Sequence, residues 1–193
     1  MENGYSFFAL LFRQKYIKRW SLMRCAVEET LSQHSMECAA VAHCLASINR
    51  EVFGGNADAE KAAVYALFHD ASEVLCGDLP SPVKYSDSTM RSVYGKIEQA
   101  SADALLSKLP EELKKVYDGP VREQTDELTL RLVKTADKLC ALIKCTEELK
   151  WGNNEFAAAE KATLETIKKY DSPELRYFLE NFMPSFSLSL DEL

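Results

Sequence analysis

The sequence predicts an all-α fold, a compact helical bundle formed by one domain. Apolar residues recur at three- and four-residue steps along most of the chain, as in helices that bury one face. No alternating run rich in Val, Ile and Thr indicates a strand, and the connections between periodic segments are short. A length of 193 residues is sufficient for one domain with a sizeable core, so we expect residues 1–193 to form a single domain.

The first half of the chain predicts three helices. Thr30 and Gln33 have the spacing of a capping box, which places the start of the second helix. Gly77 ends the third helix, and Pro80 and Pro82 should prevent it from resuming. The expected helices are Ser6–Lys18, Thr30–Asn49 and Asp58–Cys76.

The second half predicts five more helices, separated by proline and glycine. Pro110 closes the first of them, a Gly119-Pro120 break follows the second, and Gly152 ends the longest periodic segment. The expected helices are Ser88–Leu109, Glu111–Tyr117, Asp126–Trp151, Asn154–Tyr170 and Pro173–Phe182.

The charge pattern limits the choice of partners. A net charge of -7 argues against non-specific binding to nucleic acid or to an anionic membrane. One basic region is the exception, because residues 3–27 contain no acidic side chain. It is either a solvated helix face or a region that attracts phosphate. Its basic residues are Arg13, Lys15, Lys18, Arg19 and Arg24.

The cysteines and the chain start indicate the cytoplasm. The six cysteines show neither a CxxC pair nor zinc-finger spacing, so we expect free, buried thiols in a reducing compartment. The short apolar run at residues 7–12 precedes the basic residues, which is the reverse of a signal peptide. No segment has the roughly 18 uninterrupted apolar residues of a membrane span.

Several ionisable residues lie where the helical pattern expects apolar ones. The stretch ALFHDASEV, residues 66–74, places His69, Asp70 and Glu73 among core residues. Asp137 lies on the apolar side of the longest predicted helix, and His34 lies near the start of the second. Buried ionisable groups cost free energy unless something pairs with them, so these residues need partners.

A metal ion is one such partner. Two imidazoles and two carboxylates suit Mn, Co, Fe or Zn better than an oxygen-ligated Ca or Mg site. Four protein ligands leave positions open for water and substrate, as in hydrolytic sites. The alternative for Asp137 is a long-range salt bridge to an arginine, and the adjacent pair of His69 and Asp70 is weak evidence alone. His43 lies nine residues after His34, on the opposite helix face, and we expect it to be a packed core histidine.

Six segments of the sequence carry a family resemblance. The order His34, His69-Asp70 and Asp137 resembles the H…HD…D signature of the HD-domain superfamily, and the surrounding residues resemble the bacterial YfbR-type 5′-deoxynucleotidases over essentially the whole chain. The segments are RWSLMR (19–24), SQHS (32–35), HDASEVLCGDLPSPVKY (69–85), ADKLCALIKC (136–145), GNNEF (152–156) and PSFSLSLDE (184–192).

The resemblance implies an all-α homodimer that hydrolyses deoxyribonucleoside 5′-monophosphates to deoxynucleoside and phosphate. It implies one divalent ion, with Co or Mn supporting activity best and Zn, Fe, Mg or Cu as further ions to test. The small-molecule nucleotide is the expected partner, with no nucleic acid or membrane.

The resemblance also implies roles for individual residues. Arg19 would orient the phosphate, Trp20 would lie beside the sugar, and Glu73 and Asp78 would be the acidic catalytic residues, with Arg19 counted among the catalytic groups. The implied metal ligands are His34, His69, Asp70 and Asp137, and the implied substrate-binding residues are Arg19, Trp20, His34, Asp78, Leu79, Pro80 and Ser81.

Three positions depart from the family pattern. Gln33 replaces an expected glutamate, and Cys76 and Ser81 stand where threonine is expected. None removes a ligand or the arginine, so we expect activity with altered fine substrate preference. Two alternatives remain: another HD-type phosphohydrolase acting on a cyclic nucleotide, a triphosphate or an alarmone, and a non-catalytic module in which Arg19 and Glu73 are dispensable.

Overall fold

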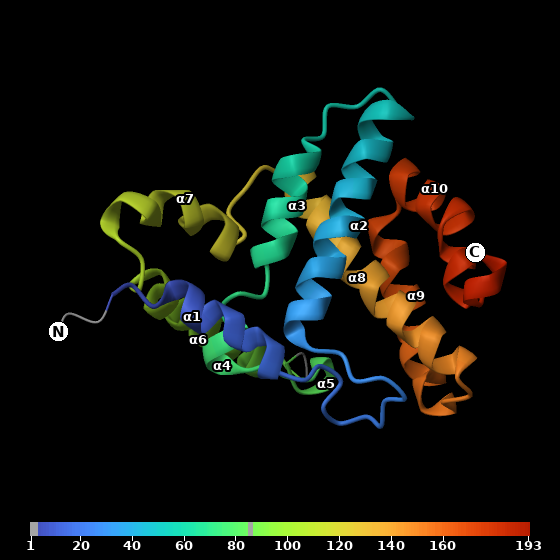
Figure 1. Ribbon diagram of the computed structural model, residues 1–193, viewed down its shortest axis with the longest axis horizontal. Helices are drawn as coiled ribbons and strands as arrows, with labels where there is room; N and C mark the ends of the chain where they lie inside the picture. Colours follow the sequence, from blue (N-terminus) through green and yellow to red (C-terminus); the bar gives the residue numbers. More distant parts are fainter. Residues whose placement is uncertain (1–3, 85–86) are drawn as a thin grey trace.

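The structure is a computed structural model that describes residues 4–84 and 87–193, apart from the side chain of Ser81. The all-α prediction is confirmed: the described residues form helices, and their one β-type pairing is an isolated bridge between Lys18 and Thr30 (Figure 1). The helices are α1 Phe7–Leu11, α2 Leu31–Glu51, α3 Ala59–Phe68, α4 Glu73–Cys76, α5 Ser81–Lys84, α6 Ser88–Leu106, α7 Glu111–Val121, α8 Glu127–Lys150, α9 Ala157–Ile167 and α10 Pro173–Asn181.

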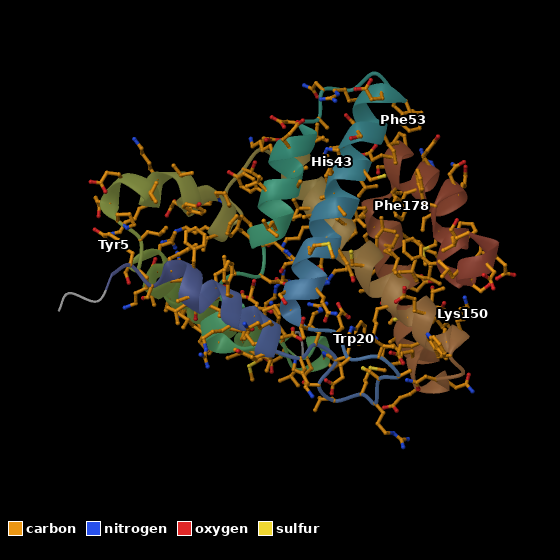
Figure 2. All side chains as sticks on the ribbon, viewed as in Figure 1. Tyr5, Trp20, His43, Phe53, Lys150 and Phe178 are labelled. Atoms are coloured by element: carbon orange, nitrogen blue, oxygen red, sulfur yellow. The ribbon has the colours of Figure 1, made fainter. Side chains whose placement is uncertain are left out.

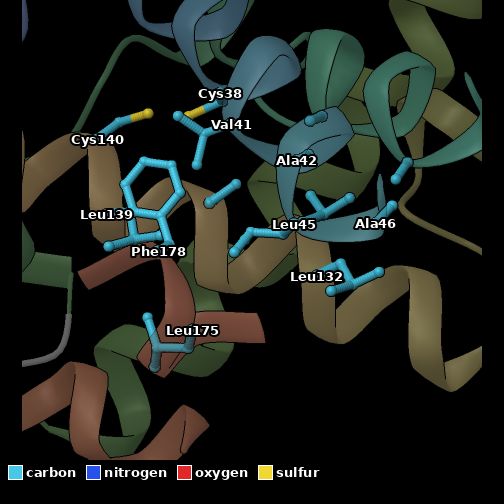
Figure 3. Close-up of a cluster of buried hydrophobic side chains, with 14 of the residues drawn as sticks. Cys38, Val41, Ala42, Leu45, Ala46, Leu132, Leu139, Cys140, Leu175 and Phe178 are labelled. Carbon is cyan, nitrogen blue, oxygen red and sulfur yellow. The ribbon is translucent and has the colours of Figure 1, made fainter. Parts of the chain in front are cut away.

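Three helices form the centre of the molecule. α2, α3 and α8 pack against one another, with α9 and α10 on one side and α1, α4, α6 and α7 on the other (Figure 1). The larger apolar core joins α2, α3, α8 and α10, where Leu45, Leu139 and Phe178 are buried together (Figure 3). A smaller core contains Phe7 and Ala71. The segment that follows α3 therefore lies where the two cores meet.

The start of α2 follows the predicted capping box. Gln33 donates its backbone N–H to the Thr30 hydroxyl, and its side-chain oxygen accepts from the Thr30 backbone N–H. Such a cap stabilises a helix by about 1 kcal/mol. It fixes the start of α2 at Leu31, three residues before His34.

The third predicted helix is wrong as a single element. α3 ends at Phe68, residues 69–72 form turns, and α4 begins at Glu73. His69 Nδ1 lies 2.6 Å from the Ala66 carbonyl oxygen, which in a continuous helix would accept from the N–H of Asp70. Glu73 N–H instead donates to Asp70 O, three residues back. His69 and Glu73 therefore do not lie one turn apart on a continuous helix, which the predicted helix Asp58–Cys76 would require.

Two predicted breaks are also wrong. α7 continues through Gly119 and Pro120 to Val121, because proline already has a helical φ and costs one hydrogen bond near a helix end. A single turn, α5, forms despite Pro82, which lies in its first turn, where a backbone N–H has no intrahelical acceptor. Gly77 does end α4, with φ of 80°.

The remaining helix limits agree with the predictions within a few residues. The first predicted helix is α1 followed by a 3-10 segment, Phe12–Tyr16, and α6 ends three residues before Leu109. None of the described helices has the length and apolar character needed to span a membrane.

His43 is a correction to the predicted core. It lies on the opposite face of α2 from His34, as expected, but that face is exposed to solvent (Figure 2). The apolar neighbours of His43 in sequence turn toward the core while its own side chain does not.

Candidate metal and phosphate site

Four of the predicted residues meet between α2, the turn after α3 and α8. His34 Nε2 lies 3.3 Å from Asp137 Oδ1 and 3.6 Å from Asp70 Oδ2, and His69 Nε2 lies 3.0 Å from the same Asp70 oxygen. His34 is fully buried and His69 nearly so. Two nitrogens and two carboxylates from three separate elements thus converge on one point.

The orientation of His69 fits a metal ion. Its Nδ1 contacts the Ala66 carbonyl, which places the proton there and leaves Nε2 with a lone pair directed at the cluster. Nε2 is buried, and although Asp70 Oδ2 lies 3.0 Å away, Nε2 makes no well-directed hydrogen bond within the described part of the chain. A buried nitrogen lone pair beside two carboxylates is a set of ligand atoms that a divalent cation can satisfy.

The charge balance of the cluster favours ionised carboxylates. Burial alone would raise the pKa of Asp70, but His69 and then His34 hold that pKa well below its usual range. Burial likewise opposes ionisation of Asp137, yet His34 and the ammonium of Lys138 lower its pKa. Lys138 Nζ lies 2.9 Å from Asp137 Oδ2, so this neighbouring lysine is an ion-pair partner of the cluster. Within the described part of the chain, the ion-pair partners of Asp137 are His34 and Lys138, and neither is an arginine.

One cysteine belongs to this cluster although the sequence did not indicate it. Ligand atoms of His34, Cys38, His69 and Asp137 all lie within 4.8 Å of one another. Cys38 follows His34 by one turn of α2 and was predicted only as a buried thiol, which it is.

Arg19 lies against the cluster, held by Glu29. Arg19 Nε donates to Glu29 Oε1 at 3.2 Å, and Arg19 Nη1 lies 3.6 Å from Asp70 Oδ2. The loop before α2 brings these residues together, because Arg19 N–H donates to the Glu29 carbonyl. Burial disfavours the charged guanidinium, but Glu29 and Asp70 raise the pKa of Arg19 overall. A largely buried, permanently charged fork is therefore directed at the ligands.

Glu29 is a site residue that sequence reasoning missed. It also accepts from Trp20 Nε1 at 2.8 Å and lies 3.4 Å from His34 Nδ1. Although burial opposes it, contact with His34 and Arg19 lowers the pKa of Glu29. Its signal was its position, at the end of the acid-free stretch and five residues before His34.

Trp20 has a strained backbone and a fixed ring. Its φ is 56°, in the left-handed region that non-glycine residues rarely adopt. The indole packs against buried Phe156, with ring centroids 5.2 Å apart, and its N–H is bound by Glu29. Local strain of this kind concentrates at functional sites.

A buried carboxylate anchors the loop that carries Arg19 and Trp20. Glu148 of α8 accepts from the backbone N–H of Ala26 at 2.7 Å and of Val27 at 3.2 Å. Lys144 and Asn153 also donate to it. The two backbone hydrogen bonds tie the loop before α2 to the end of α8, and Lys144 and Asn153 hold the carboxylate in place.

Glu73 lies in an environment that favours its neutral form. Burial, followed by the charges of Asp70 and Asp78, raises the pKa of Glu73 to about 10. Its Oε2 is buried without a hydrogen-bond partner among the described residues, and its Oε1 lies 3.9 Å from Lys84 Nζ. A protonated carboxyl there is a proton donor with no acceptor of its own.

The remaining predicted substrate residues follow α4. Asp78, Leu79 and Pro80 are half-buried in the segment between α4 and α5, and α5 begins at Ser81. The side chain of Ser81 lies outside the described part of the structure. Burial raises the pKa of Asp78, and the nearby Arg19 opposes that rise, so Asp78 and Arg19 act on each other electrostatically.

A cavity of about 430 Å³ opens beside the HD pair. The residues that line this cavity do not include Arg19 or Trp20. The sequence did not indicate the pair Glu123 and Lys134, whose closest Nζ–Oε distance is 2.5 Å, or the positive φ of Glu123 at 53°. The ionisable and aromatic residues of this wall are His69, Asp70, Lys84, Arg91, Tyr94, Glu98, Arg122, Glu123 and Lys134.

The helical fold and this cluster define an HD-domain phosphohydrolase, a hydrolase class with a metal-binding HD pair. The family described as 5′-deoxynucleotidase YfbR-like matches residues 6–186. The chain belongs to this family.

Curated relatives agree with that assignment. The 5′-deoxynucleotidase VV1113 of Vibrio vulnificus is 50% identical over 188 residues, covering 97% of both chains. The 5′-deoxynucleotidase YfbR of Escherichia coli K12 is 49% identical over 189 residues, covering 97% of this chain and 94% of its own.

Solved structures share the fold. An HD-domain phosphohydrolase from Listeria innocua superposes with a TM-score of 0.83 at 24% identity, covering 94% of this chain and 88% of its own. The HD phosphohydrolase of cyanophage S-2L, solved with bound dA and one catalytic Zn²⁺ ion, has a TM-score of 0.65 at 17% identity and covers 92% and 96%.

Proposed function

We propose that the chain is a divalent-metal-dependent 5′-deoxynucleotidase, one HD-type domain that hydrolyses deoxyribonucleoside 5′-monophosphates to deoxynucleoside and phosphate. The observation that carries this proposal is the buried cluster of His34, His69, Asp70 and Asp137 with the Arg19 guanidinium 3.6 Å from Asp70. The family and the names of the curated relatives support the same reaction.

The four ligands would hold one divalent ion. A bound ion neutralises charge on the phosphate and lowers the pKa of water, which makes a nucleophile available near neutral pH. The Zn²⁺ of the cyanophage neighbour supports zinc, and the family resemblance favours cobalt or manganese. Iron, magnesium and copper complete the set to be tested.

Arg19 would recognise the phosphate of the substrate, and Trp20 would recognise its sugar. Arg19 offers a planar fork that suits two phosphate oxygens and that lysine cannot imitate. Glu29 limits the rotation of both side chains, so neither has to be ordered on binding. An indole packed beside C2′ tolerates hydrogen and excludes a hydroxyl, which would favour deoxyribose.

Glu73 and Asp78 would handle the protons. The raised pKa of Glu73 supports a role as the acid that protonates the leaving 5′-oxygen. Asp78, close to Arg19 in the segment after α4, would position the nucleophilic water or the guanidinium. Leu79, Pro80 and Ser81 would extend this wall of the substrate site.

The chain would act as a cytoplasmic homodimer, without nucleic acid or membrane. The net charge of -7 supports the absence of polyanionic partners, and the six free cysteines support a reducing compartment. The dimer is supported by the family resemblance.

Phosphate release tests the proposed function. The purified chain, stripped with a chelator and reloaded separately with Co, Mn, Zn, Fe, Mg or Cu, is offered dAMP, dGMP, dTMP and the matching ribonucleotides. We expect release from deoxynucleotides with at least one ion and much slower release from ribonucleotides. Release from none of the deoxynucleotides with any ion would overturn the proposal, and turnover of only cyclic nucleotides or triphosphates would favour another HD-type reaction.

A further inference from the structure

Cys38 lies at the inner side of the metal cluster. It is fully buried on α2, one turn after His34, and its Sγ lies 3.5 Å from His34 Nε2 and 3.7 Å from Nδ1. Sγ is also within 4.8 Å of the ligand atoms of His69 and Asp137. A thiol at this distance is in contact with the ligand set rather than behind it.

The spacing matches that of donors around one small cation. With metal–nitrogen and metal–sulfur distances of about 2.0 and 2.3 Å, two neighbouring donors of one ion lie roughly 3.0 to 3.5 Å apart, depending on the coordination geometry. The observed Sγ–Nε2 distance is 3.5 Å, and the Nε2–Oδ1 distance from His34 to Asp137 is 3.3 Å. Sγ lies at similar distances from both nitrogens of the His34 ring, which places it over the face of the ring. The Cys38 side chain therefore has to rotate toward the ion when the ion binds.

A second observation at the same place points to a ligand. His69 Nε2 is buried and makes no well-directed hydrogen bond among the described residues, with Asp70 Oδ2 3.0 Å away, and it belongs to the same group of atoms as Cys38 Sγ. An unpaired imidazole nitrogen and a thiol facing one point form a mixed N/S donor pair, which zinc and cobalt prefer and which manganese and magnesium do not.

We propose that Cys38 is an additional metal donor in this protein, and that its thiolate biases the site toward Zn²⁺ and Co²⁺ over Mn²⁺ and Mg²⁺. The thiol proton leaves to solvent as the metal–sulfur bond forms, since a coordinating thiol is deprotonated by the ion. The inference rests on the proposed function for the position of the ion.

Cys140 offers the competing explanation. Its sulfur faces that of Cys38 across the α2–α8 interface, and both are buried (Figure 3). If the two thiols only pack against each other, Cys38 is a core residue and metal preference does not depend on it. Cys140 belongs to the same core cluster but not to the group of ligand atoms, so it is the matched control.

Cobalt spectroscopy separates the two explanations. The chelator-treated protein is titrated with Co²⁺ while visible ligand-field bands report occupancy of the site and a near-ultraviolet sulfur-to-cobalt charge-transfer band reports thiolate coordination. We expect both signals in the wild type and in Cys140→Ala. Cys38→Ala should keep the visible bands and lose the charge-transfer band, and Cys38→Val provides the same test with less cavity formation in case Cys38→Ala does not fold.

Competition titrations complete the experiment. In Cys38→Ala or Cys38→Val, the affinity for Zn²⁺ relative to Mn²⁺ should fall by about tenfold or more, the loss typical of residues that merely orient a ligand. Visible bands without a charge-transfer band in the wild type would overturn the role of Cys38 and leave the proposed function intact. No cobalt binding at all would overturn both, and an unchanged charge-transfer band in both Cys38 variants would overturn the assignment to this thiol.

Discussion

The carboxylate of Glu29 fixes the guanidinium of Arg19, with Nε 3.2 Å from Oε1 and the Arg19 backbone N–H on the Glu29 carbonyl. The same carboxylate binds the Trp20 indole and lies 3.4 Å from His34. One side chain therefore orients a phosphate-binding candidate, a sugar-binding candidate and a metal ligand. Preorganisation of this kind reduces the entropy that substrate binding costs.

Replacing Glu29 by Gln should damage catalysis while the protein remains folded. The amide preserves the shape but removes the charge that holds Arg19, so kcat/KM for dAMP should fall by about 10- to 100-fold. Steady-state kinetics measure the change. Glu28→Gln is the control, because Glu28 is exposed and forms its ion pair with Lys18, which is also exposed. Equal kinetics for both variants would remove Glu29 from the site.

Trp20→Ala should relax sugar discrimination. Loss of the indole beside C2′ removes the group that excludes a hydroxyl, so the ratio of kcat/KM for dAMP over AMP should fall by about 10-fold or more. Trp151→Ala is the control because Trp151 is exposed at the end of α8. An unchanged ratio in Trp20→Ala would assign Trp20 a packing role against Phe156 alone.

Glu148→Ala should destabilise the fold and loosen the loop before α2. Removing a buried carboxylate deprives buried Lys144 of its charge partner and leaves two backbone N–H groups unpaired, a loss of about 3–5 kcal/mol in the free energy of unfolding. Urea unfolding measures it, with exposed Glu147→Ala as the neighbouring control. A loss below about 1 kcal/mol, the scale of a surface pair, would contradict the anchoring role.

The stability of the metal-free protein should depend on pH through Glu73. Its pKa is raised to about 10 in the fold, so between its ordinary range and pH 10 the folded state keeps a proton that the unfolded chain releases. Stability from this group is therefore lost as pH rises, by at most about 1.4 kcal/mol per pH unit. Glu73→Gln removes the dependence, and urea unfolding at pH 6 and pH 8 should show the variant gaining on the wild type.

Glu112→Gln, an exposed acid on α7, is the control for that comparison. Parallel pH curves for the wild type and Glu73→Gln would show that Glu73 is ionised in the fold and is not the proton donor.

Local sequence signals predicted most of the fold. Periodicity, the Thr30 cap and Gly77 placed the helices within a few residues. The break at His69 escaped prediction because it depends on a side chain occupying the Ala66 carbonyl, a contact that periodicity does not encode. Exposure of His43 escaped because apolar neighbours in sequence point elsewhere on a helix.

The predicted ligands meet, but their supporting residues were not predicted. His34, His69, Asp70 and Asp137 were recognisable because ionisable groups interrupt apolar patterns. Glu29 and Cys38 interrupt no apolar pattern, because Glu29 lies in a loop and Cys38 has the character of a core residue. Their relation to the site depends on how the loop before α2 and the α2–α8 interface fold.

The central claim is that Asp137 and the HD pair hold the ion that hydrolysis requires. The direct measurement is metal content and phosphate release from dAMP in the same preparations of the wild type, Asp137→Ala and the exposed surface control Asp171→Ala. We predict about one ion and full turnover for the wild type and control, and neither in a folded Asp137→Ala. An Asp137→Ala protein that retains both the ion and turnover would contradict the account.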